Sequence, residues 1–310
     1  MISFRYLVVS TCAVLLALAV GVAIGASSLS AATLSAIGTD RAGSSGQLGV
    51  LTADRDAART QQSQSDRVLG AAAPALVSGR LAERSVVLLA APGAAPADLD
   101  AVSGLVAQAG GHVTGALGLT DAALAPDRAD ALRTLVTRVL PAGVQLPATT
   151  DAGALTGALL GALVTTGDGP TSSPAEVGTA FTALADGGFL APGPAPAPAQ
   201  VALVVTGDGP AAPDAAGRAT TLAHLAGALH AGGAGTVVAS RAASGEVAAV
   251  RADQSLADVS TVDGVGTAAG RIATVLAVGE QAQGRSGSYG TAPGAAALPG
   301  TAPGPAPAPA

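Results

Sequence analysis

The sequence predicts an α/β protein in three parts: an N-terminal transmembrane helix, a short helical stalk with a weak coiled-coil pattern, and an α/β domain with a small, mostly parallel sheet. Three observations predict this architecture. The chain opens on a long uncharged apolar stretch, a heptad rhythm follows it, and short apolar runs then alternate with amphipathic helical segments. The expected divisions are residues 1–26 for the anchor, 27–70 for the stalk, 80–283 for an extracytoplasmic α/β domain, and 284–310 for a disordered tail rich in Gly, Pro and Ala.

Residues 7–24, LVVSTCAVLLALAVGVAI, carry no charge and form the expected membrane segment. At roughly 1.5 Å of rise per residue, a helix of this length spans about 27 Å, which suits a hydrocarbon core about 30 Å thick. A signal peptide cleaved near residues 23–25 is the alternative. The apolar run is longer than the usual signal core, which favours an uncleaved single-pass anchor. Because Arg5 precedes the segment, the positive-inside rule places the N-terminus in the cytoplasm and the rest of the chain outside it.

A heptad rhythm follows the anchor, with alternating spacings of three and four residues that are typical of a coiled coil. Only about half of these positions are apolar, and four glycines interrupt the stretch, each weakening a helix by up to about 1 kcal/mol relative to alanine. Two interpretations stay open: a single amphipathic stalk, or a coil between copies of the chain that makes a homo-oligomer. The heptad positions are Leu34, Ile37, Arg41, Ser44, Leu48, Leu51, Arg55, Ala58, Gln62, Ser65 and Leu69.

Short apolar runs from residue 85 onward predict strands, and segments with apolar residues three and four apart predict helices. Because the two kinds alternate, we expect a mostly parallel sheet. Asp151 stands before one helix candidate as its N-cap. Residues 191–199, APGPAPAPA, are expected to form an exposed loop of polyproline type. The strand candidates are residues 85–91, 112–119, 201–206 and 236–239, and the helix candidates are residues 97–109, 127–140, 151–164, 175–186, 214–231 and 270–281.

Composition excludes some classes of protein. The formal charge is −6, which argues against nucleic acid as a partner. Aromatic residues make up 2% of the chain, so the core must be built from Ala, Val and Leu. Cys12 is the one cysteine and lies in the anchor, so no disulfide can form within a single chain.

The sequence holds no pattern typical of a catalytic, cofactor-binding or metal-binding site, and we expect a protein that is not an enzyme and has no cofactor. His224 and His230 lie six residues apart on one helix candidate, about 240° around it, and cannot share a face as metal ligands do. His112 is the third histidine. Copper(I) prefers Cys and Met ligands, and the chain has neither beyond the anchor. The motif GDGP, at residues 167–170 and 207–210, is typical of a turn more than of a ligand loop.

Several strings spread along almost the whole chain carry a family likeness. They are the opening MISFRYLVVSTCAVLLALAVGVAIGASSLS, the stalk string LTADRDA at residues 51–57, and residues 86–91, 102–111, 140–143, 204–207, 260–263, 270–271, 275–277 and 289–290. Together they resemble the actinobacterial copper-transport protein B (MctB) family.

The resemblance implies a membrane-anchored envelope protein of copper efflux or homeostasis, placed in the outer membrane, with copper as a transported ion. It also implies an alternative. Some relatives are single-pass coiled-coil scaffolds or activators of cell-wall hydrolysis in cell separation, with a cell-envelope protein as partner and no metal transport of their own.

Overall fold

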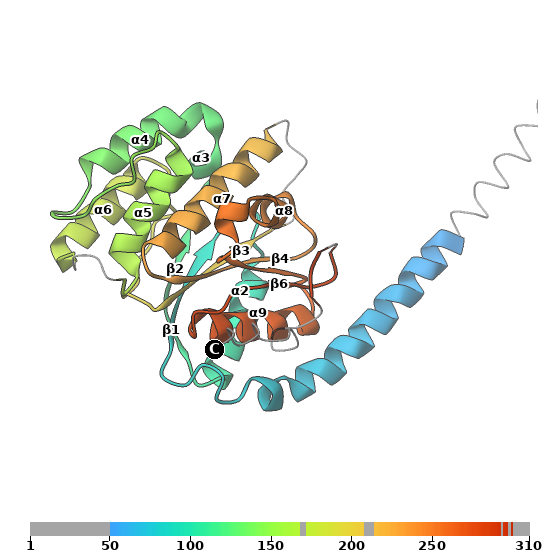
Figure 1. Cartoon of the computed structure of the whole chain (residues 1–310). Helices are drawn as coiled ribbons and strands as arrows, with labels where there is room; N and C mark the ends of the chain where they lie inside the picture. Colours follow the sequence, from blue (N-terminus) through green and yellow to red (C-terminus); the bar gives the residue numbers. More distant parts are fainter. Residues whose placement is uncertain (1–49, 168–171, 208–213, 293, 297–298, 300–310) are drawn as a thin grey trace, which may run out of the picture. The chain divides into compact units, whose positions relative to one another are not determined.

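The computed structural model describes residues 50–167, 172–207, 214–292, 294–296 and 299 (Figure 1). Packing divides the chain into two compact units, residues 1–64 and 65–310. The predicted membrane segment and the heptad positions before residue 50 lie outside the described residues. Within the described part, no helix is both long enough and apolar enough to span a membrane.

Residues 50–77 are helical, as the heptad spacing predicts for the end of the stalk. In the first unit, every residue from 50 to 64 is exposed, including the apolar Val50 and Leu51. In the second unit, Ala73 and Val77 are buried in the core of the domain. The helix therefore extends past the stalk boundary expected at residue 70, and its last turns belong to the domain.

Six parallel strands form one sheet in the order β2-β1-β3-β4-β5-β6. The predicted α/β fold with a small parallel sheet is confirmed. The two strands after β4 were not among the predicted strands, because one is only four residues of mixed polarity and the other only two. The strands are β1 (Ser85–Ala90), β2 (His112–Gly118), β3 (Val201–Thr206), β4 (Gly235–Ser240), β5 (Ser260–Asp263) and β6 (Ser288–Tyr289).

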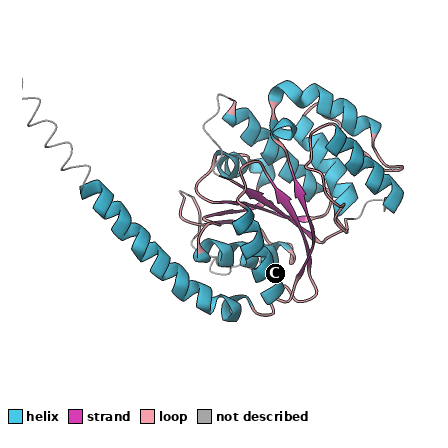
Figure 2. Ribbon diagram, turned by 180° about the vertical axis from the view of Figure 1, so that it is seen from behind, coloured by secondary structure: helices cyan, strands magenta, loops and turns pink. Residues whose placement is uncertain are grey.

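Helices cover both faces of the sheet (Figures 1 and 2). One core, with Leu203 and Val205 of β3, packs against α2 (Pro96–Gln108) and α9 (Ala268–Gln281). The other core, with Ala202 and Val204, packs under the remaining helices. This alternation along a strand is the expected pattern for a sheet buried on both faces. The second layer contains α3 (Asp121–Leu124), α4 (Ala129–Arg138), α5 (Ala152–Val164), α6 (Pro174–Asp186), α7 (Ala215–Ala231) and α8 (Gly245–Ala252).

Glycines bring α5 and α7 into close contact. A Cβ on Gly153 would overlap the carbonyl oxygen of Thr221, and a Cβ on Gly157 would overlap that of Leu225. Both glycines lie on one face of α5, four residues apart, so the two helices meet almost backbone to backbone. The side chains of α7 that flank this contact are thereby held at a fixed distance from the N-terminus of α5.

The Pro-Ala segment at residues 191–199 is exposed except at Pro196 and Ala199, as predicted, but the sequence did not indicate that it is bonded to the sheet. It covers the open edge of β2, where the Ala191 N–H donates to Gly118 O at 2.8 Å and the Ala197 N–H donates to Thr114 O at 3.4 Å. Pro196 is buried, and a Cβ on Gly115 would lie 2.6 Å from the Pro196 ring. Composition reveals the extended conformation of such a segment but not the strand edge that it protects from pairing.

The tail prediction is wrong for residues 284–292. Residues 288–289 pair with β5 as β6, and the Ala296 N–H donates to Ser288 O at 2.8 Å beside them. Gly, Pro and Ala give these residues little apolar area to bury, so composition alone predicts disorder. They are ordered through hydrogen bonds to the domain, with buried Asp263 as the main acceptor. Residues 300–310 lie outside the described part of the chain.

Candidate functional site

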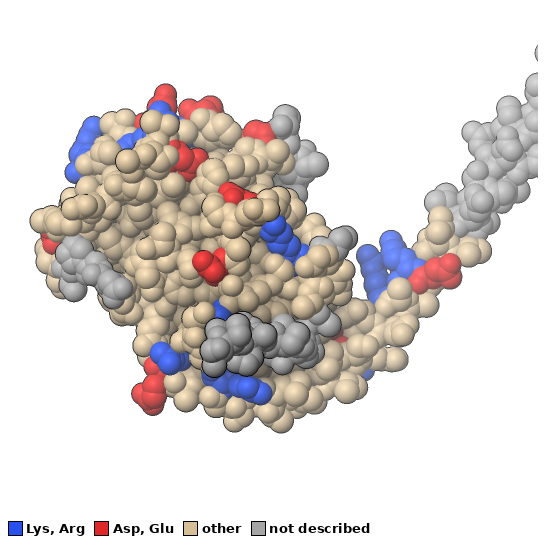
Figure 3. Space-filling view, in the orientation of Figure 1, with Lys and Arg blue, Asp and Glu red and all other residues tan. Residues whose placement is uncertain are grey.

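A groove of about 1500 Å³ lies along α5 and α7, and we name it the α5–α7 groove. Its walls are mostly Ala, Gly, Pro, Val and Leu, with few groups that can titrate. In Figure 3, charged side chains gather along α3 and α4 at the upper edge, whereas the surface over α5 is uncharged. An apolar groove with few polar groups is the usual form of a ligand or partner site. Lining residues include Val144, Leu146, Ala158, Ala162, Pro196 and His224.

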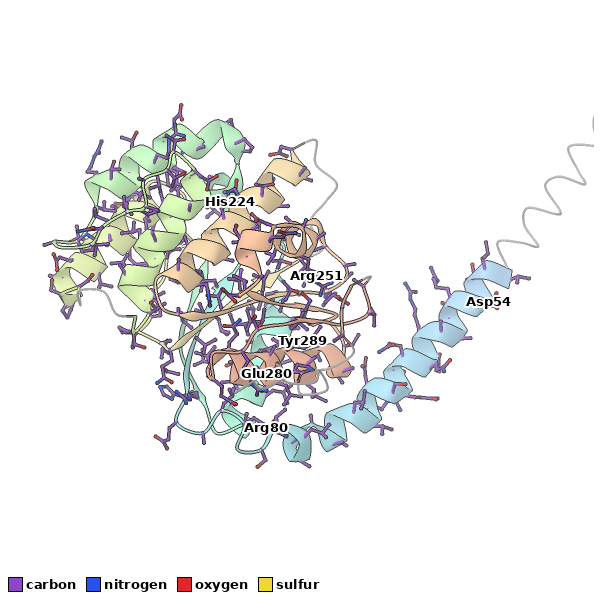
Figure 4. All side chains as sticks on the ribbon, in the orientation of Figure 1. Asp54, Arg80, His224, Arg251, Glu280 and Tyr289 are labelled. Atoms are coloured by element: carbon purple, nitrogen blue, oxygen red, sulfur yellow. The ribbon has the colours of Figure 1, made fainter. Side chains whose placement is uncertain are left out.

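Among the described residues that line the groove, His224 on α7 is the one titratable side chain (Figure 4). Its Nδ1 lies 2.9 Å from Oδ2 of Asp151, and each side chain is about one third exposed. The ring nitrogen is close enough for a charge interaction but is not aligned for a hydrogen bond. Asp151 is also the N-cap of α5, as predicted, because its Oδ1 accepts the Ala154 N–H at 2.7 Å. One carboxylate therefore both starts α5 and faces the groove histidine.

Asp253 lies within electrostatic reach of this pair. The side-chain hydroxyl of Ser255 and then its backbone N–H lower the pKa of Asp253, and the charge of His224 lowers that pKa further. The Ser255 donors are at 2.7 and 2.9 Å from Asp253 Oδ1, so this carboxylate is used to cap a 3₁₀ turn. Within the described part of the chain, no group of three or more His, Cys, Asp and Glu side chains could hold a metal ion.

A row of polar side chains crosses the carboxyl edge of the sheet. Thr206, Ser240 and Asp263 are register partners at the ends of β3, β4 and β5, and all three are buried. The Ser240 hydroxyl donates to Ala242 O, and Asp263 binds Arg251, but Thr206 Oγ1 has no hydrogen-bond partner among the described residues. Polar residues at this edge are where parallel α/β sheets place their chemistry.

At the switch point of this sheet, the described parts of the two flanking loops are in contact. Strand order reverses between β1 and β3, where doubly wound sheets bind ligands. Here a Cβ on Gly207 would overlap the carbonyl oxygen of Gly93, so the loops after the two strands touch. The second GDGP motif begins at Gly207, and residues 168–170 and 208–210 of the two motifs lie outside the described residues.

Two arginines share the buried carboxylate of Asp98 beside this edge. Arg241 Nε and Arg271 Nη2 each lie 2.9 Å from one of its oxygens, and Asp98 is 2% exposed. The three residues come from α2, the loop after β4, and α9. This cluster joins three elements at the carboxyl edge, and each carboxylate oxygen of Asp98 is paired with one arginine.

A second buried cluster holds the segment after α9. The hydroxyl of Tyr289 donates to Glu280 Oε2, and Arg285 lies 3.5 Å from the other carboxylate oxygen (Figure 4). Burial and, next, the hydrogen bond to the Glu280 carboxylate raise the pKa of the Tyr289 hydroxyl. Because the phenol stays protonated, it remains a donor to Glu280 across the physiological range.

The sequence predicted no site residue. The structure brings together side chains that lie far apart in the sequence. It brings His224 to Asp151, whereas the Nδ1 atom of His230 is buried with no partner in the described residues. His112 is exposed at the start of β2. The cap at Asp151 was visible in the sequence, but nothing there indicated that the same carboxylate faces α7.

The described residues define an α/β domain of the doubly wound class with an apolar groove on one helical layer. A family model described as "Copper transport outer membrane protein, MctB" matches residues 1–299. The chain is 37% identical over 308 residues to a copper transporter MctB of Mycobacterium tuberculosis (strain ATCC 25618 / H37Rv), covering 95% of this chain and 98% of that protein. It is 33% identical over 314 residues to a copper transporter MctB of Mycobacterium leprae (strain TN), covering 96% and 99%. The chain therefore belongs to the MctB family, as its sequence strings implied.

Proposed function

We propose that this chain is a membrane-anchored protein of the cell envelope that serves copper efflux and homeostasis, with its α/β domain outside the cytoplasm. The observation that supports this most is the family match over residues 1–299, together with 37% identity over 95% of the chain to a copper transporter MctB of M. tuberculosis. The matched range includes the apolar residues 7–24, which supports the proposal of an anchor there.

Copper is, in this proposal, the cargo of an assembly and not a resident cofactor of the domain. His224 and Asp151 offer one nitrogen and one carboxylate at the groove, and the described residues hold no larger ligand group. Copper(I) favours sulfur ligands, and Cys12 and Met1 are the only sulfur-containing residues of the chain. The proposed role of the domain is to bind protein partners and to position the anchors of several copies.

Homo-oligomerisation through the stalk is part of the same proposal. Val50 and Leu51 are 61% and 64% exposed on the helix at residues 50–77, and Leu51 occupies a heptad position. Exposed apolar residues at heptad spacing are what a coil between copies would bury. Sedimentation of the full chain in detergent tests this: we expect an oligomer, and Leu51→Asp should shift it toward a monomer.

The function is tested in a strain that lacks the gene. We expect lower copper tolerance, restored by the full chain but not by a chain without residues 1–26, because the domain then loses its membrane attachment. Both forms must be checked for equal abundance. Unchanged copper tolerance in the deletion strain contradicts the proposed function.

A second candidate function is a scaffold or activator in cell-wall hydrolysis, and the α5–α7 groove favours it. An apolar groove on an extracytoplasmic domain suits a protein partner more directly than an ion. Ala162→Glu places a charge on the groove wall, and Thr182→Glu, at an exposed position of α6, is the matched control. Septal defects with Ala162→Glu at normal copper tolerance would favour the scaffold; lost copper tolerance with normal septa would favour copper homeostasis.

A further inference from the structure

The helical residues 50–64 of the first unit bury none of their side chains. Every residue in this range is exposed, and Val50 and Leu51 are 61% and 64% exposed. An isolated helix of about 15 residues is marginal in water, and in folded proteins most helical stability comes from the packing of one apolar face. A partner that lies along one face of this helix would supply the burial that residues 50–64 lack.

The charges of this stretch follow the heptad, whose positions are lettered a to g with a and d at the contact between helices. When Leu51 and Ala58 occupy d positions, Asp54 occupies position g and Arg59 occupies the next position e. In a parallel coil of two copies in register, each g residue lies beside the following e residue of the other helix, and opposite charges there select the partner. Asp54 of each copy would thus lie beside Arg59 of the other.

A seam shifted by one residue fits the charges less well. With Val50 and Ala57 at the d positions, Asp54 would occupy an a position. Two carboxylates would then face each other inside the contact, where like charges destabilise the pair. The charge pattern therefore favours the seam that contains Leu51 and Ala58.

Both charges of the proposed contact are available on the surface of the helix. Asp54 has no ion-pair partner among the described residues, and it lies near the described start of the helix (Figure 4). Arg59 Nη1 lies 3.9 Å from Asp56 Oδ1, and its side chain is 69% exposed. Figure 3 shows charged side chains of both signs gathered at this end of the helix. Pairing between copies would therefore break no buried or close ion pair.

The a positions of the same seam are polar, because they hold Arg55 and Gln62. A polar residue at an a position lowers the stability of a coil but fixes its register and the number of its strands. Arg55 Nη2 lies 3.1 Å from Oδ1 of Asp56, which occupies the outer position b, so this guanidinium is directed away from the seam. These features indicate a weak coil with one preferred register.

We propose that two copies of this chain pair through a parallel, in-register coil over residues 51–62, in which Asp54 of each copy binds Arg59 of the other. The inference rests on the proposed function, since anchors at residues 7–24 in one membrane require both stalks to run in the same direction. It adds to that function the partner, the direction, the register and the two residues that select the partner.

A charge exchange in the full chain in detergent tests the pairing. Asp54→Arg gives positions 54 and 59 the same positive charge, and Arg59→Asp gives both the same negative charge. Each variant alone should associate roughly tenfold more weakly than the unchanged chain, because two attractive contacts become repulsive. An equimolar mixture of the two variants should recover the association, and so should both changes in one chain. Sedimentation measures each case.

Asp56→Arg is the matched control for the charge exchange. It changes the charge of the chain as much as Asp54→Arg does, but at the outer position b. We expect it to leave the association within about twofold of the unchanged chain. Positions 54, 56 and 59 are all exposed, so none of these variants removes a contact of the domain core.

Disulfide formation measures the direction and the register. In a Cys12→Ser background, Ala58→Cys places a thiol at position d, where the same residue of both copies meets only in a parallel, in-register coil. Ala57→Cys, at the outer position c, is the control. We expect chains with Ala58→Cys to cross-link in pairs at least tenfold faster than chains with Ala57→Cys.

The outcomes separate this inference from the proposed function. An unchanged chain that sediments as a monomer would overturn both the homo-oligomer and the coil. An oligomer whose two charge variants do not recover association on mixing would overturn the coil alone. So would equal cross-linking rates for Ala58→Cys and Ala57→Cys, because the copies would then meet elsewhere or in another register.

Discussion

Arg251 and Asp263 form a buried ion pair at the carboxyl edge of the sheet, with Nη2 3.0 Å from Oδ2 and the carboxylate side chain 1% exposed. The same nitrogen of Arg251 donates to Tyr289 O at 2.9 Å. Asp263 in turn accepts the backbone N–H groups of Thr291 and Ala292, at 2.6 and 3.2 Å. One ion pair therefore fixes both the last strand and the segment that follows it.

Asp263→Asn should loosen that segment. The amide keeps the shape of the side chain but removes the charge that balances Arg251, which is itself only 13% exposed. Breaking a buried pair in this way costs about 3–5 kcal/mol of unfolding free energy. Urea denaturation measures the loss, and amide hydrogen exchange should quicken first at residues 288–292. Asp258→Asn, at an exposed position, is the control; equal exchange in the two variants would contradict this role.

Stability should fall in acid through the same carboxylate. Burial alone would raise the pKa of Asp263, but the N–H groups of Thr291 and Ala292 and the Arg251 guanidinium together lower that pKa below its ordinary value. The unfolded chain therefore takes up the proton first, at a pH near 3.9. The stabilisation is complete above that pH and is lost as the pH falls through the folded-state pKa. Denaturation midpoints measured from pH 6 to pH 2.5 should decline less steeply in Asp263→Asn; parallel curves would contradict the assignment.

Tyr289→Phe should destabilise the domain by about 1–3 kcal/mol, because buried Glu280 loses a hydrogen-bond donor. Glu280→Gln removes the negative charge of the group that accepts the tyrosine hydrogen bond. A double-mutant cycle of the two changes, followed by thermal unfolding, should give a coupling energy on the order of 1 kcal/mol. If the free-energy changes of Tyr289→Phe and Glu280→Gln simply add, the hydrogen bond between the two side chains contributes nothing beyond packing.

Gly157→Ala should destabilise the domain by about 1–3 kcal/mol, because the new methyl group would force α5 away from the backbone of α7. Gly178→Ala on α6 is the matched change: open space surrounds this glycine, so the alanine should stabilise its helix by about 0.5–1 kcal/mol. Chemical denaturation of both variants measures these two changes in the free energy of unfolding. Similar effects of the same sign would mean that α5 and α7 do not depend on the glycine contact.

The sequence was sufficient to predict a helix or strand wherever that element buried a continuous apolar face. The predicted strand at residues 201–206 matches β3 in its bounds, and the Asp151 cap predicted the start of α5. It was insufficient where an element is held by hydrogen bonds from distant residues. STVD in β5 carries three polar residues: Gln281 bonds Ser260, and Arg251 bonds both Thr261 and Asp263. Neither partner is local in the sequence.

The candidate site was less predictable than the fold, for a physical reason. The close contact of α5 with α7 depends on Gly153 and Gly157, which local sequence marks only as weak helix formers. His224 meets Asp151 only because that packing brings α7 to the start of α5. The anchor at residues 7–24 and the heptad positions before residue 50 stay predictions from the sequence.

Copper content of cells tests the central claim most directly. In a strain without this gene, grown in copper that the parent strain tolerates, the account predicts more cell-associated copper per milligram of protein than in the parent. The full chain should restore the parental value, and a chain without residues 1–26 should not. Equal copper content and equal survival in the deletion and parent strains would contradict a role in copper efflux.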